Sequence, residues 1–131
     1  MSLSKTLLFD MTYDEFNELC SSMAATSYVV QWRGAHVWKV GGKVFAIGGW
    51  EKSSSPAFTF KASDYDFNLL KDELGFRPAP YMASRGLQWL QMYDVSKENI
   101  EELNYYIKES YRIVSLGLTK KKQNELGLNQ S

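Results

Sequence analysis

The sequence has very few of the residues on which most catalytic and metal sites depend. His36 is the one histidine and Cys20 the one cysteine among 131 residues. With so few of them, we find no Ser-His-Asp, Cys-His or multi-histidine metal arrangement. A lone cysteine also cannot form a disulfide within the chain. We therefore expect a protein that is not an enzyme, has no catalytic residues and needs neither a metal nor another cofactor.

Long apolar runs and a net charge are also lacking. No apolar stretch approaches the roughly 18 residues of a membrane span, and the first residues do not form a secretory signal. We expect a cytoplasmic protein without a membrane partner. The 15 basic and 15 acidic residues cancel, so no overall field attracts nucleic acid, and any such binding must come from a local patch.

The stretch from His36 to Ala62 is the expected centre of the fold. Apolar residues alternate with others on both sides of Gly41-Gly42, which predicts two antiparallel strands joined by a two-residue turn. A third strand follows at Phe58 after a polar loop. The turn implies a register in which three pairs share the core face: Val40 with Lys43, Trp38 with Phe45, and His36 with Ile47.

The remaining periodicities predict three helices and two more strands. We expect helices over 13–23, from Ser63 to Gly75 and from Ser96 to Gly117, and further strands over 28–33 and 87–93, with residues 76–86 as a loop. These elements indicate an α+β fold: an antiparallel sheet of about five strands with helices on one face and the other face partly open. Residues 1–119 would form a single domain, and residues 120–131 a basic tail too polar to pack alone.

The basic residues are the most suggestive candidates for a binding site. Lysines flank the Gly41-Gly42 turn, and others border the following loops beside aromatic residues, as in a surface that contacts phosphates. The candidate nucleic-acid-binding residues are Lys39, Lys43, Lys52, Lys61, Arg77 and Arg85, with Lys120 to Lys122 nearby and a pocket at Tyr81 and Trp89. The alternative is that these lysines only solubilise the protein and protect strand edges.

Other chemistry has weaker support in the sequence. Cys20 lies on the apolar stripe of the first helix, which is typical of a buried structural thiol. His36 on an alternating strand is more typical of a packed residue than of a general base. Carboxylates near the first helix could bind a cation, but their scatter is typical of a solvated face: Asp10, Asp14, Glu15 and Glu18.

Three segments together resemble the MmcQ/YjbR family of small bacterial proteins: KVGGKVFAI, PAPYMASRG with Trp89 following, and SYRIVSLGLTKKK. The resemblance covers nearly the whole chain. It implies a CyaY-like α+β fold and DNA binding through a double-wing arrangement, but transfers no established activity. Many members carry an Asn-Lys-x-His-like cluster before the tryptophan, where this chain has residues 83–88 with Arg85 as the one charge.

Three hypotheses follow. The leading one is a non-enzymatic DNA-binding protein that contacts phosphates through its basic hairpin and loop. The first alternative is a protein-interaction domain whose partner is a second copy or another protein. The second alternative is a small-molecule or metal-binding protein.

Overall fold

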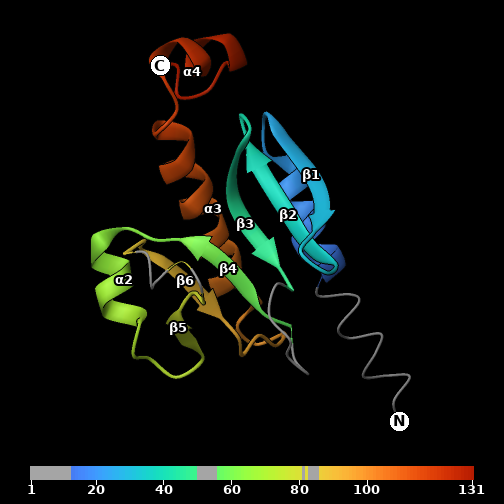
Figure 1. Ribbon diagram of the computed structural model, residues 1–131, viewed down its shortest axis with the longest axis vertical. Coiled ribbons are helices and arrows are strands. Elements are labelled where there is room, and N and C mark those ends of the chain that lie inside the picture. The colour runs from blue at the N-terminus through green and yellow to red at the C-terminus, as the bar shows by residue number, and fades with distance from the viewer. Residues whose placement is uncertain (1–12, 50–55, 81, 83–85) are drawn as a thin grey trace.

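A computed structural model describes residues 13–49, 56–80, 82 and 86–131. It contains one antiparallel six-stranded sheet with helices packed against it (Figure 1). In sheet order the strands are β1 (Thr26–Gln31), β2 (Ala35–Val40), β3 (Lys43–Gly48), β4 (Phe58–Lys61), β6 (Trp89–Met92) and β5 (Phe76–Pro78). The helices are a first helix over 13–22, α2 (Asp64–Leu70), α3 (Ile100–Leu116) and α4 (Lys120–Leu126).

The main core lies between the sheet and its helices. Each helical region contributes to this cluster, with Phe16 from the first helix, Leu70 from α2, Ile107 from α3 and Leu118 before α4. Figure 1 shows α3 crossing behind β3 and β4, the strands it contacts most. The predicted α+β fold with helices gathered on one face is confirmed.

The sheet has one strand more than expected. The segment from Phe76 was predicted to be a loop because of its prolines, but its first three residues form β5 and pair with β6. Proline cannot donate to a ladder and is therefore confined largely to edge strands. Pro78 lies on such an edge, so its presence is compatible with a strand.

A β-bulge changes the register of the central hairpin. Val40 pairs with Lys43 as predicted, but Trp38 pairs with Ala46 and not with Phe45. A bulge opposes two residues to one and shifts the faces beyond it. Phe45 and Ala46 consequently both join the core, whereas Ile47 pairs with Val37 on the opposite face. The predicted pairs of Trp38 with Phe45 and His36 with Ile47 are therefore wrong.

The second face of the sheet, which we expected to be partly open, is buried at its centre. Val37 and Ile47 have no exposed surface, and neither do the polar residues Thr59 and Gln91 on the adjacent strands. The register aligns these four side chains in one row across β2, β3, β4 and β6. Exposed positions on this face are therefore found toward its margins.

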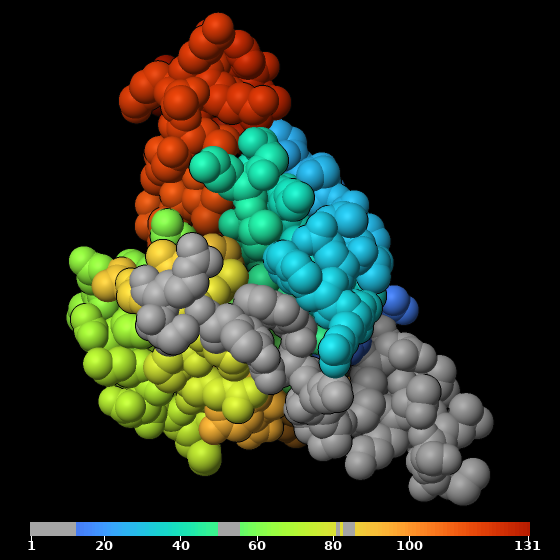
Figure 2. Space-filling model, viewed as in Figure 1, coloured from blue at the N-terminus to red at the C-terminus, as the bar shows by residue number. Residues whose placement is uncertain are grey.

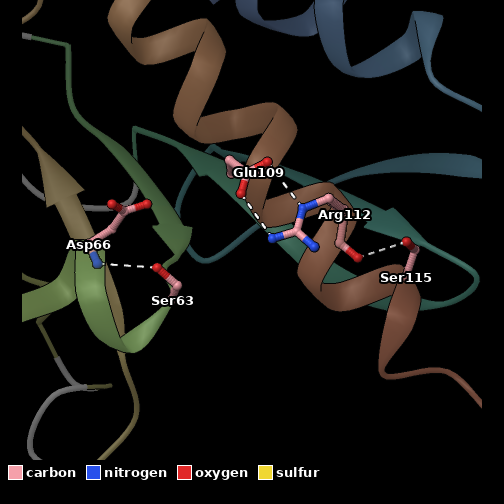
Figure 3. Close-up of polar contacts among 5 residues, drawn as sticks. All are labelled: Ser63, Asp66, Glu109, Arg112 and Ser115. Carbon is pink, nitrogen blue, oxygen red and sulfur yellow. Dashed lines mark hydrogen bonds and ion pairs between the residues drawn. The ribbon is translucent and has the colours of Figure 1, made fainter.

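Two helix ends differ from the predicted ones. Ser63 caps α2 as expected, since its Oγ accepts a hydrogen bond from the Asp66 N–H at 3.1 Å (Figure 3). However, α2 ends at Leu70, and Gly75 lies beyond it with a positive φ. Helix α3 begins at Ile100 and not directly after Ser96, because residues 97–99 form a turn.

The C-terminal segment packs against the domain, contrary to the expected polar tail. Thr119 caps α4 by accepting a hydrogen bond from the Lys122 N–H at 3.0 Å. Leu118 and Leu128 on either side of the helix are buried. Gln123 is also buried and donates to the Leu118 carbonyl at 2.8 Å. Buried leucines and a hydrogen-bonded amide therefore attach this polar segment to the domain.

Candidate nucleic-acid interface

The charged side chains of the six described strands are all basic: Lys39, Lys43, Lys61 and Arg77. Side chains alternate between faces along a strand, and Lys39 and Lys61 are each two positions from a residue of the buried row on the second face. Arg77 is paired directly with Gln91 of that row. These three basic residues therefore belong to the face opposite the helices.

The hairpin end of the sheet gathers further positive charge. Lys43 is exposed beside the turn, and the lysines that begin α4 are exposed as well. Helix α4 lies against this turn. The closeness is seen at Gly41, where an added side-chain carbon would come within 2.7 Å of Leu118 and 3.1 Å of Leu126. Figure 2 shows α4 forming one end of the molecule next to the β2–β3 hairpin. The hairpin and α4 thus form one basic end: Lys39, Lys43, Lys120, Lys121 and Lys122.

Sequence reasoning grouped Lys120 to Lys122 with the other basic residues but placed them in a tail too polar to pack alone. It did not predict a helix at this position or its packing beside the hairpin. A signal was available in Thr119, a good N-cap residue, and in the leucines at 118, 126 and 128.

Arg77 lies apart from the basic end. Four strand-to-strand steps separate β2 from β5, which corresponds to about 19 Å at about 4.8 Å per step. Its Nε–H donates to Gln91 Oε1 at 2.7 Å, and its guanidinium carbon lies 5.2 Å from the centre of the Tyr93 ring. Lys61 lies between these regions, on β4.

The other predicted residues are only partly described. Lys52, Arg85 and Tyr81 lie outside the described residues. Trp89 is buried on β6, with 8% of its surface exposed, and it is not among the residues that line a cavity found elsewhere in the described structure. That cavity, of about 370 Å³, lies instead between α2, β5 and the start of α3. Glu73, Asp94 and Glu102 line it together with apolar side chains, so it would repel a phosphate.

Negative charge is concentrated away from the strands. In the described part of the chain, every aspartate and glutamate lies on a helix or a connecting segment. Arg112 on α3 is neutralised there, because its Nη2 and Nε donate to the two carboxylate oxygens of Glu109 at 3.0 and 3.1 Å (Figure 3). Among the described residues, no carboxylate forms such a pair with the four basic strand residues. The neutral total therefore conceals a separation of charge.

His36 is part of a polar network beneath the first helix. Trp38 Nε1 donates to Asn17 Oδ1 at 2.9 Å, which turns the Asn17 amide nitrogen toward His36 Nδ1 at 3.4 Å. The Tyr28 hydroxyl lies 2.8 Å from the same Nδ1. The Asn17 amide nitrogen can only donate, so the form of His36 that fits this contact is the neutral imidazole with its proton on Nε2, and the Tyr28 hydroxyl can then donate to Nδ1 as well. Burial lowers the pKa of His36, although Asp14 opposes this shift.

The free energy of unfolding should consequently fall on mild acidification. A base whose pKa is lowered by folding binds its proton more readily in the unfolded chain, so stability rises with pH. The contribution is complete above the unfolded pKa of about 6.5 and is lost as the pH falls toward the lower folded pKa. Urea denaturation at pH 7.5 and 5.5 would measure it. His36→Gln should reduce the change in the free energy of unfolding between these two pH values. An equal change in the wild-type protein and the variant would show that His36 is not its source.

The cysteine and the potential metal-binding side chains form no second candidate site within the described part of the chain. Burial raises the pKa of the Cys20 thiol far above its ordinary value, which suits a structural role. No three His, Cys, Asp or Glu side chains among the described residues are placed to hold a metal ion. None of the described helices is long and apolar enough to cross a membrane.

Comparisons with known proteins agree with this fold. No curated protein matches the chain. A crystal structure of the Deinococcus radiodurans protein DR2400, described as a DUF419 domain, is similar with a TM-score of 0.74 and 20% identity. The similarity covers 91% of this chain and 90% of that chain. A family model described as YjbR matches residues 21–113, and the chain therefore belongs to the YjbR family.

Proposed function

We propose that the protein is a non-enzymatic nucleic-acid-binding module that contacts phosphates through its basic end. The supporting observation is the separation of charge. All charged residues of the described strands are basic, and α4 adds three exposed lysines beside the hairpin. Phosphate contacts from lysine and arginine supply most of the affinity in non-specific nucleic-acid binding. The DNA binding that the family resemblance implies is consistent with this proposal.

The basic end resembles a phosphate-binding surface more than a set of scattered solubilising charges. Solubilising lysines usually alternate with carboxylates, whereas no acidic residue of the described chain lies on a strand, and Glu125 is the one carboxylate on α4. Lys39 is half-buried and paired with Val44, so part of its stem is fixed near the turn. Lys43 and the α4 lysines remain exposed.

Removing one of these charges should weaken binding without regard to base sequence. We expect Lys43→Ala to lower the affinity for double-stranded and single-stranded DNA alike, and to reduce the slope of log affinity against log salt by about one unit. Fluorescence anisotropy with labelled oligonucleotides between about 50 and 200 mM salt covers the range where such binding changes steeply.

Lys108→Ala is the matched control, because Lys108 is exposed on α3 among carboxylates and outside the basic end. It should leave affinity and slope unchanged. Equal effects of the two substitutions would argue against the basic end as the contact surface. Absence of binding by the wild-type protein at 50 mM salt would refute the proposed function itself.

A further inference from the structure

Two buried polar side chains in the middle of the sheet stand out from their surroundings. Thr59 on β4 and Gln91 on β6 have no exposed surface and occupy the same row as Ile47 and Val37. Burying a hydroxyl and an amide is unfavourable unless both are hydrogen-bonded. Two apolar side chains could fill the same positions without this loss of hydration free energy. We therefore consider a functional role for these two residues.

The two residues form a hydrogen-bonded chain that ends at a surface cation. Gln91 Nε2 donates to Thr59 Oγ1 at 3.3 Å, and this contact orients the amide. Gln91 Oε1 then faces β5 and accepts from the Nε–H of Arg77 at 2.7 Å. The buried Thr59 thereby influences the orientation of an exposed arginine that it does not touch.

Arg77 is consequently held at two points. Gln91 engages its Nε, and the Tyr93 ring lies 5.2 Å from its guanidinium carbon. A guanidinium carries five N–H donors in a rigid plane, so fixing Nε fixes the directions of the remaining donors. Among the described residues no carboxylate pairs with Arg77. The lysines of the basic end have no comparable side-chain support in the described structure.

We propose that Arg77 is a preorganised contact for a pair of hydrogen-bond acceptors on the nucleic acid, and that Gln91 and Thr59 are its positioning residues. This inference rests on the proposed function and adds a second, oriented contact to the lysine-rich end. A fixed guanidinium fits two acceptors on one planar edge, which a nucleic acid offers as two phosphate oxygens or as O6 and N7 of guanine.

The experiment measures oligonucleotide affinity at fixed salt for single and double variants. Gln91→Met and Arg77→Lys should each lower affinity by about tenfold, the size expected of one good bidentate contact. Thr59→Val should lower it several-fold, whereas Thr59→Ser, which keeps the hydroxyl, should retain it. Oligonucleotides of equal length with and without guanine distinguish the two kinds of acceptor. If the variants lose the same affinity for both, Arg77 contacts phosphate, and if they lose affinity only for the guanine-containing one, Arg77 contacts guanine.

A double-variant comparison separates positioning from a purely structural role. In an Arg77→Lys background, Thr59→Val should have almost no further effect on affinity, whereas in a Lys43→Ala background its effect should be undiminished. General destabilisation would instead weaken binding equally in both backgrounds. Should Thr59→Val fail to fold, Gln91→Met supports the same comparison because it preserves side-chain length.

The two proposals fail in different ways. One outcome is that the wild-type protein binds and that Lys43→Ala weakens binding, whereas Thr59→Val and Gln91→Met leave the affinity unchanged. This outcome overturns the positioning role, while the proposed function stands. Additive effects of Thr59→Val and Arg77→Lys overturn it as well. If the wild-type protein binds no oligonucleotide at 50 mM salt, the proposed function is refuted and this inference with it.

Discussion

Ser110→Ala is expected to lower the free energy of unfolding by about 2 to 4 kcal/mol, because it leaves one buried and one part-buried backbone group without a partner. The Ser110 hydroxyl donates to the Phe45 carbonyl at 2.6 Å and accepts from the Lys61 N–H at 2.8 Å. Phe45 is the bulge residue, and the β3–β4 ladder stops beside it at Ala46 and Phe60. A side chain of α3 therefore links β3 to β4 just beyond the last pair of their ladder.

Urea denaturation followed by tryptophan fluorescence would measure this loss. Ser110→Thr keeps the hydroxyl and should recover part of the stability. Ser21→Ala is the matched control, since the exposed Ser21 hydroxyl donates only within its own helix, to the Glu18 carbonyl. A loss no larger for Ser110→Ala than for Ser21→Ala would show that the bulge does not depend on α3.

Gly41→Val is expected to destabilise the protein and to separate α4 from the hairpin. Gly41 has a φ of +55°, in a region that costs a side-chain-bearing residue about 1 to 2 kcal/mol. A carbon at this position also meets Leu118 at 2.7 Å, and overpacking of this kind costs about 1 to 3 kcal/mol. Because α4 carries Lys120 to Lys122, its displacement should also weaken DNA binding.

Gly42→Val provides a control that differs only in the contact with α4. Gly42 also has a positive φ, +86°, but a side-chain carbon there would meet no atom within 4 Å. Its substitution should therefore show the backbone strain alone and leave DNA affinity nearly unchanged. The difference between the two variants measures α4 docking, and identical stability and affinity in both would exclude a role for α4 in the basic end.

Much of the fold could be predicted because it depends on local patterns. The Gly41-Gly42 turn, the capping of α2 by Ser63 and the stripe of α3 each involve residues close in sequence. Their physical causes, which are turn conformation, cap hydrogen bonds and helical periodicity, act over a few residues. The strand at Phe76 was missed because two prolines favoured a loop, and pairing with β6 outweighed that preference.

The candidate site was predictable only in part. The basic character of Lys39, Lys43, Lys61 and Arg77 is visible in the sequence, but the separation of charge around a neutral total depends on which face each residue occupies. The face of Ile47 was mispredicted because a one-residue bulge reverses the alternation beyond it. The bulge is satisfied by Ser110, which is 65 residues away from Phe45.

The sequence by itself determined the α+β class, the hairpin, the order of the helices and strands other than β5 and α4, and the exclusion of multi-histidine chemistry. Composition and short-range periodicity carry that information. Tertiary structure alone decided that α4 docks on Gly41, that Gln91 and Thr59 orient Arg77, and that the second sheet face is buried at its centre. These features arise from contacts between residues distant in sequence, and such contacts form only when the sheet and its helices have assembled.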